Sequence, residues 1–172
     1  GHHPFLLLVL GLVLGPLCLP LAASALRHDE PGLIERLSRG RAGTGSVDVL
    51  VGIDGSAEAE HALRRAVGLL RWRIGRLTLA TVLDYDVSAG SFLAEDHEKA
   101  RGDLIRTADA TSPRPETIVL SGRPAEALRK YAVEEAYDVI VVGRRGHSAN
   151  RVLLGSVASE LARGDEVPVL IV

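Results

Sequence analysis

The chain has 172 residues and a formal net charge of −2 at pH 7. Its length suits one domain with an extension, and its charge offers no strongly basic surface for a nucleic-acid partner. Cys18 is the single cysteine, which excludes a disulfide within the chain and a cysteine metal site. The histidines show no ligand-like spacing, so we expect no metal centre.

The first predicted element is the apolar segment of residues 1–26. Within it, residues 5–25 form an uncharged run of 21 residues, which at about 1.5 Å per residue is long enough to cross a hydrocarbon core of roughly 30 Å. The basic residues lie only on its C-terminal side, starting at Arg27. This asymmetry predicts a transmembrane helix with the rest of the chain in the cytoplasm.

Two alternatives stay open for this segment. Ala23-Ser24-Ala25 resembles a signal-peptide cleavage site, and the opening Gly-His-His suits a tag remnant. The sequence contains no methionine, which favours a piece of a longer protein. We therefore expect residues 5–25 to be the last membrane helix of a transporter-like protein, with a cleaved leader as the main alternative.

Residues 27–46 are predicted to be a linker. Proline and glycine recur through it and interrupt any long element. Within it, only "GLIERLS", residues 32–38, suits one or two short helical turns.

Strand-like and helix-like patterns alternate over residues 47–172. The apolar, β-rich runs predict strands over residues 47–53, 76–83, 116–120, 138–143 and 167–172. Helices are predicted over residues 56–72, 92–108, 123–136 and 156–163. Ser56 is placed to cap the first helix, Gly102 to interrupt the second, and Pro124 to stand in the first turn of the third. Trp72 is expected to pack with the first helix.

This alternation predicts the fold class. Nearly continuous apolar strands separated by helices indicate an α/β domain with a mainly parallel five-stranded sheet covered on both faces. Ligands in such sheets bind outside the carboxyl ends of the strands. Asp54 and Gly143 both lie at strand ends.

The predicted strand at residues 138–143 ends in a glycine, and more glycines and a serine follow in a set order: Gly143, Gly146, then Gly155-Ser156. Glycine at a strand end lets the backbone turn sharply or approach a ligand closely. The pair Gly155-Ser156 opens a helix, whose first N–H groups lack partners within the helix and favour an anion. The pattern predicts a phosphate cradle built from two backbone corners. The alternative is that the glycines only form turns and Ser156 only caps a helix.

Nearby arginines, at positions 144, 145 and 151, add positive charge to this segment.

Other phosphate and hydrolase motifs do not fit. No G-x-x-x-x-G-K-[ST] loop is present, and "GHSAN" misses the last glycine of the G-x-S-x-G nucleophile elbow.

The segments "VLVGIDGS", "SGRPAEAL", "DVIVVGRRG", "LLGSVASEL" and the closing "VPVLIV" resemble the universal stress proteins over residues 47–172. The resemblance implies a doubly wound sheet with strand order 3-2-1-4-5. It also implies binding of ATP or AMP, with magnesium as a companion ion, because many members bind ATP through G-x2-G-x9-G-[ST].

The resemblance also implies the site residues. Matched by position, Ile53 and Asp54 would face the nucleoside, and Val82 would touch the adenine. The ribose and phosphates would be lined by Val142, Gly143, Gly146, Gly155, Ser156 and Val157.

One spacing departs from the family pattern. Eight residues, "HSANRVLL", separate Gly146 from Gly155, where the pattern has nine. A deletion in the solvent-facing part of this arc would leave both corners in place. A deletion in its helical part would rotate the residues after it by about 100°. The shorter arc favours the alternative function, a dimerisation or interaction module of the same fold that binds no nucleotide.

The expected function is therefore nucleotide-dependent regulation or sensing without fast chemistry, and slow ATP hydrolysis stays open. The terminal strand is apolar at every position except its proline, and such an edge favours pairing with a second copy. The resemblance likewise implies a homodimer through this strand.

Overall fold

The computed structural model describes residues 31–38, 45–83, 94–146 and 154–172. Residues 31–172 form one compact unit, and the predicted membrane segment at 5–25 lies outside the described residues. Among the helices that the structure describes, none has both the length and the apolar character needed to cross a membrane.

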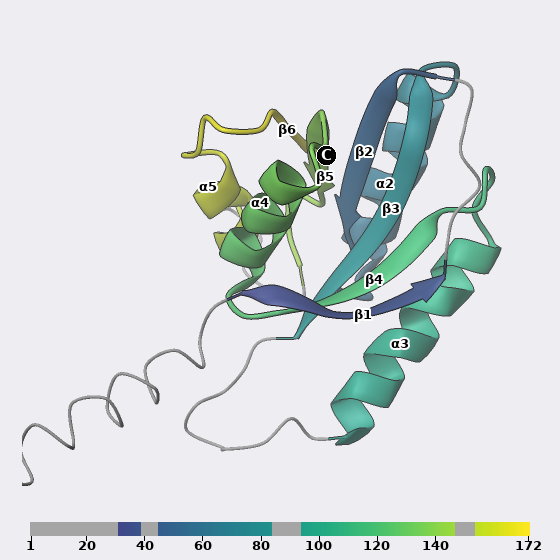
Figure 1. Ribbon diagram of the computed structural model, residues 1–172, viewed down its shortest axis with the longest axis vertical. Coiled ribbons are helices and arrows are strands. Elements are labelled where there is room, and N and C mark those ends of the chain that lie inside the picture. The colour runs from purple at the N-terminus through teal and green to yellow at the C-terminus, as the bar shows by residue number, and fades with distance from the viewer. Residues whose placement is uncertain (1–30, 39–44, 84–93, 147–153) are drawn as a thin grey trace, which may run out of the picture. The chain divides into compact units, whose positions relative to one another are not determined.

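A six-stranded sheet forms the centre of the domain (Figure 1). Its order is β1-β4-β3-β2-β5-β6, and every neighbouring pair is parallel except β1 with β4. The last five strands of this order reproduce the predicted 3-2-1-4-5 arrangement, so the predicted fold class is confirmed. The strands are β1 Gly32–Ser38, β2 Val47–Gly52, β3 Ile74–Leu83, β4 Glu116–Ser121, β5 Val139–Val142 and β6 Val169–Ile171.

Strand β1 corrects the prediction for "GLIERLS". This segment is not helical but pairs antiparallel with β4, with Gly32 opposite Ser121 and Ser38 opposite Thr117. Seven residues are too few for a helix that is stable by itself. The open edge of β4 supplies backbone partners over its whole length, and that pairing decides the conformation.

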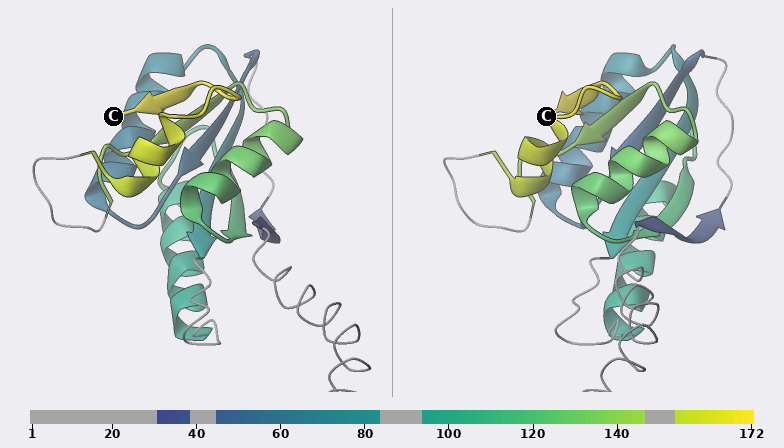
Figure 2. Two further views of the ribbon diagram at one scale, coloured as in Figure 1. Left: turned by 90° about the vertical axis from the view of Figure 1, so that its left-hand side faces the viewer. Right: turned by 60° about the vertical axis from the view of Figure 1, so that its left-hand side comes forward.

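Helices cover both faces of the sheet (Figure 2). Helices α4 (Pro124–Glu134) and α5 (Ser156–Leu161) pack on one face, and α2 (Ala57–Leu70) and α3 (Ala94–Asp109) pack on the other. Successive residues of β2 serve the two layers in turn, because side chains alternate across a strand. Leu50 packs with α4 and α5, whereas Val49 and Val51 pack with α2 and α3.

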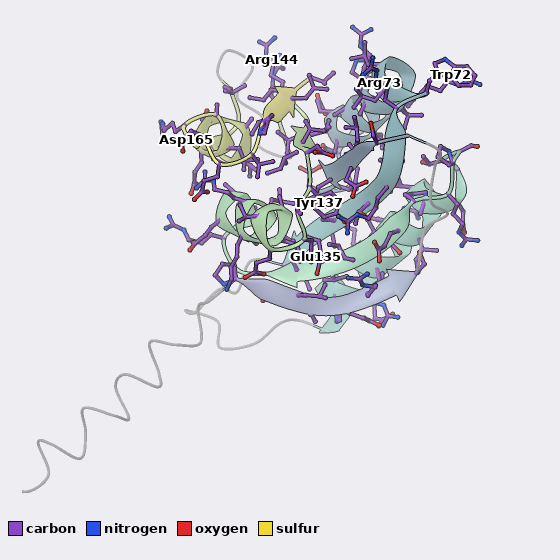
Figure 3. All side chains as sticks on the ribbon, turned by 45° about the horizontal axis from the view of Figure 1, so that its top comes forward. Trp72, Arg73, Glu135, Tyr137, Arg144 and Asp165 are labelled. Carbon is purple, nitrogen blue, oxygen red and sulfur yellow. The ribbon has the colours of Figure 1, made fainter. Side chains whose placement is uncertain are left out.

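Most helix signals are confirmed, with two differences. Ser56 caps α2 by accepting a hydrogen bond from the N–H of Ala59 at 3.2 Å, and Pro124 stands in the first turn of α4. Helix α3 continues through Gly102 instead of being interrupted there. The prediction for Trp72 is wrong: α2 ends at Leu70, and the Trp72 side chain is 84% exposed beyond it (Figure 3).

A polar network crosses the layer between the sheet and α4. The hydroxyl of Tyr137 donates to Oγ1 of Thr78 at 2.6 Å. The Thr78 hydroxyl in turn donates to Oε2 of the buried Glu116 at 3.3 Å. The guanidinium of Arg76 lies 4.1 Å from the centre of the Tyr137 ring. Tyr137 is buried, and its burial raises the pKa of its phenol far above the ordinary value of about 10.

This raised pKa predicts a loss of stability in alkali. The folded state keeps the Tyr137 proton more tightly than the unfolded state does. The contribution of the protonated phenol to the free energy of unfolding is therefore fully present below about pH 10 and decreases as the pH rises above that value. In Tyr137→Phe the unfolding free energy should fall less steeply above pH 10, by up to about 1.4 kcal/mol per pH unit. Urea unfolding of both proteins between pH 8 and 11 measures this, and equal slopes would contradict it.

Candidate functional site

A cavity of about 350 Å³ lies at the carboxyl ends of the parallel strands. Its walls come from the ends of β2, β3 and β5, the first turns of α2 and α4, and the start of α5. The sheet order explains the place: β3 and β5 lie on either side of β2, so their carboxyl ends meet at one edge. The lining residues are Gly52, Ile53, Asp54, Ala59, Ala80, Val82, Pro124, Leu128, Val142, Gly143, Arg145, Gly146, Gly155, Ser156, Val157 and Ala158.

Every site residue that the sequence predicted lines this cavity. They are Ile53, Asp54, Val82, Val142, Gly143, Gly146, Gly155, Ser156 and Val157. The set comes from four separate stretches of the chain, which only the fold brings together.

The carboxylate of Asp54 is oriented by the start of α2. Its Oδ1 accepts hydrogen bonds from the N–H of Ser56 at 2.9 Å and from the Ser56 hydroxyl at 2.6 Å. Ser56 is buried and also caps α2, so the helix end and the carboxylate hold each other in place. The other oxygen, Oδ2, lies against Gly146.

Gly143 and Gly146 lie where a side chain would be crowded by its neighbours. A Cβ atom at Gly143 would lie 3.0 Å from the backbone of both Glu58 and Arg145, and one at Gly146 would overlap Oδ2 of Asp54. The prediction of a tight turn between them at a strand end agrees with this geometry. The turn brings the segment after β5 against the first turn of α2.

The second corner, Gly155, meets the first one directly. The N–H of Gly155 donates to the carbonyl oxygen of Arg144 at 3.0 Å, and a Cβ atom at Gly155 would lie 3.7 Å from the nitrogen of Gly146. The arc of residues 147–153 lies outside the described residues, as does Arg151. Its two described ends nevertheless stand side by side, although the arc is one residue shorter than the family pattern.

The cavity lining combines a few polar residues with many apolar ones. Asp54 and Arg145 are the ionisable residues among its described lining, and Ser156 adds a hydroxyl-bearing residue. In α5, the first N–H that donates within the helix is that of Ser159, to the Gly155 carbonyl at 2.8 Å. Strand β3 and helix α4 contribute the apolar residues Ala80, Val82, Pro124 and Leu128 to the lining. A ligand with a flat apolar part and a polar or anionic part suits such a cavity.

Sequence reasoning missed several wall residues: Gly52, Ala59, Ala80, Pro124, Leu128 and Ala158. Their residue types are those of an ordinary core, so no local signal separates them from it. Arg145 was noted only as nearby charge, and it lines the cavity. Within the described ranges, no three His, Cys, Asp or Glu side chains gather as metal ligands.

Comparisons with known proteins agree with this architecture. The sequence profile of the universal stress protein family matches residues 48–172. A Staphylococcus aureus (strain USA300) protein named as a universal stress protein is 31% identical over 137 residues, which cover 73% of this chain and 82% of that protein.

Solved structures give the same result. A universal stress protein in complex with cAMP is 32% identical, with a TM-score of 0.55, over 75% of this chain and 98% of that one. The universal stress protein of Archaeoglobus fulgidus in complex with dAMP is 22% identical, with a TM-score of 0.57, over 73% and 96%; at this identity it supports the fold alone. The profile, the relative and the fold agree, and the chain belongs to the universal stress protein family.

Proposed function

We propose that residues 47–172 form a regulatory domain that binds an adenine nucleotide, ATP or AMP, in the cavity at the carboxyl ends of the strands. The supporting observation is the convergence of Asp54, the two glycine corners and Ser156 on one cavity whose other lining residues are mostly apolar. A solved relative at 32% identity is a complex with cAMP, which is also an adenine nucleotide.

Each part of the nucleotide has a matching part of the cavity. The adenine would lie against Val82 and the other apolar lining residues of β3 and α4, and the ribose near Ile53 and Asp54. The phosphates would face the corners at Gly143–Gly146 and Gly155–Ser156, where backbone N–H groups are donors. Magnesium binds proteins through few carboxylates together with substrate phosphates, and Asp54 is the carboxylate among the described lining residues.

The proposed role is regulation and not fast chemistry. Ser56 occupies Oδ1 of Asp54 with two hydrogen bonds, so this carboxylate is better suited to orienting a ligand than to activating water. Slow hydrolysis of ATP stays compatible with the site. The alternative function, an interaction module without nucleotide, is favoured by the shortened arc and opposed by the direct contact between its two ends.

Assembly and membrane attachment belong to the same proposal. Strand β6 forms one edge of the described sheet, and a second copy pairing there would give a homodimer. Light scattering at micromolar concentration should then report a dimer.

An apolar anchor at residues 5–25, as the end of a transporter-like protein, would place the domain where ATP is abundant. A mature N-terminus at Leu26 in the native host would exclude that anchor.

Two measurements test nucleotide binding. Mass spectrometry of the purified, denatured protein should detect co-purified ATP or AMP. Calorimetric titration with ATP-magnesium, AMP and cAMP should then give saturable binding, with guanosine triphosphate as the control for the base. No binding of any adenine nucleotide at millimolar concentration would reject the proposal and favour the interaction module.

A further inference from the structure

Strand β1 begins beside the end of β4 that leads into α4, a helix that lines the cavity. It begins at Gly32, directly after Pro31, and pairs along β4 to Ser38. The hydroxyl of Ser121 donates to the Gly32 carbonyl at 3.2 Å. The start of β1 is therefore attached to the end of β4, the same end of the strand from which the chain continues into α4.

The turn between β4 and α4 links β1 to the wall of the cavity. Pro31 is buried against Gly122: a Cβ atom at Gly122 would lie 2.9 Å from Cα of Pro31. Gly122 has a φ of +105°, which glycine adopts without strain. Its N–H donates to the Leu83 carbonyl at 3.1 Å. Leu83 is the neighbour of the cavity residue Val82, and Pro124 lies two positions after Gly122.

A side-chain anchor holds the middle of β1. The guanidinium of Arg36 forms an ion pair with Glu116, and its Nη2 donates to the Tyr131 hydroxyl at 3.2 Å. Glu116 lies on β4 and Tyr131 on α4, so one β1 side chain contacts both elements that flank the turn. Glu116 is buried, which makes the loss of its cation costly.

We propose that β1 is a coupling strand: occupation of the cavity and docking of β1 onto β4 stabilise each other through the turn at residues 121–124. The coupling to nucleotide rests on the proposed function, whereas the mechanical link between β1 and the cavity wall does not. The strand thereby connects the state of the cavity to the chain that precedes Pro31. Such a coupling is reciprocal, because each event must favour the other by the same factor.

Hydrogen–deuterium exchange of the full chain tests the coupling, and its first arm uses no ligand. In Arg36→Ala, amides of β1 and of residues 121–128 should exchange about fivefold or more faster, while those of the central strand β2 should not change. Ser38→Ala, which removes the 2.8 Å hydroxyl contact with Thr117, is a milder variant that leaves Glu116 paired. Arg114→Ala, which removes an exposed ion pair with Asp109, is the matched control and should leave both segments unchanged.

Faster exchange of β1 alone, with residues 121–128 unaffected in both variants, would overturn the coupling whether or not a nucleotide binds. Faster exchange over the whole chain in Arg36→Ala would report a global loss of stability. In that case the exchange of residues 121–128 in Ser38→Ala decides whether β1 is coupled to the cavity wall.

The second arm adds ATP-magnesium. Exchange of β1 should slow on binding, and the ATP dissociation constant of Arg36→Ala should rise about fivefold or more. Protection of residues 143–146 and 155–158 without protection of β1 would reject the coupling and keep the proposed function. Protection of neither segment would reject nucleotide binding, and the ligand-free arm then still decides the link between β1 and the cavity wall.

Discussion

Val82→Phe is expected to weaken adenine-nucleotide binding about tenfold or more, which corresponds to about 1.4 kcal/mol of binding free energy. Val82 lies near the end of β3, where it lines the cavity beside Ala80 and is packed against the α4 side of the core. A phenyl ring at this position would take up space in the cavity of about 350 Å³ where the adenine would lie. Calorimetric titration with ATP-magnesium measures the change.

The matched control is Val133→Phe, the same substitution on the outer side of α4. Val133 is 50% exposed and is not among the residues that line the cavity. Its variant should bind as the unmodified chain does, with an unchanged unfolding midpoint. If Val82→Phe binds ATP with undiminished affinity while keeping its fold, the adenine does not lie against β3.

Leu50→Ala is expected to lower the free energy of unfolding by about 2 to 5 kcal/mol, through lost transfer energy and the void that remains. Leu50 is fully buried in the central strand β2. It belongs to the cluster that also holds Ala80, Leu128 and Val142, which line the cavity. Denaturant unfolding followed by circular dichroism gives the size of the loss.

Leu69→Ala is the control for this change, because Leu69 lies on α2 and is 67% exposed. Its effect should stay within about 0.5 kcal/mol, as for most surface substitutions. Losses of similar size in the two variants would mean that the cluster around Leu50 does not hold the domain together.

Local sequence signals were sufficient to predict the α/β alternation of the domain. These signals are β-branched runs with turn residues at their ends, Ser56 before an amphipathic run, and Pro124 in a first turn. The order of the five main strands further depended on a family resemblance. Trp72 is an example of what such signals do not predict. The helical pattern continues to residue 72, but α2 ends at Leu70 and the indole is exposed to solvent.

Packing between distant segments determined the features that local signals could not predict. Residues 32–38 have no strong preference of their own, and the open edge of β4 makes them a strand. Leu128 looks like any core residue of α4, and it lines the cavity because packing places it beside Gly52 at the end of β2, where a Cβ atom at Gly52 would lie 3.1 Å from Cδ1 of Leu128. The place of Oδ2 of Asp54 against Gly146 joins residues far apart in the chain. Such contacts follow from tertiary packing, which acts between distant segments and leaves no periodic trace in the sequence.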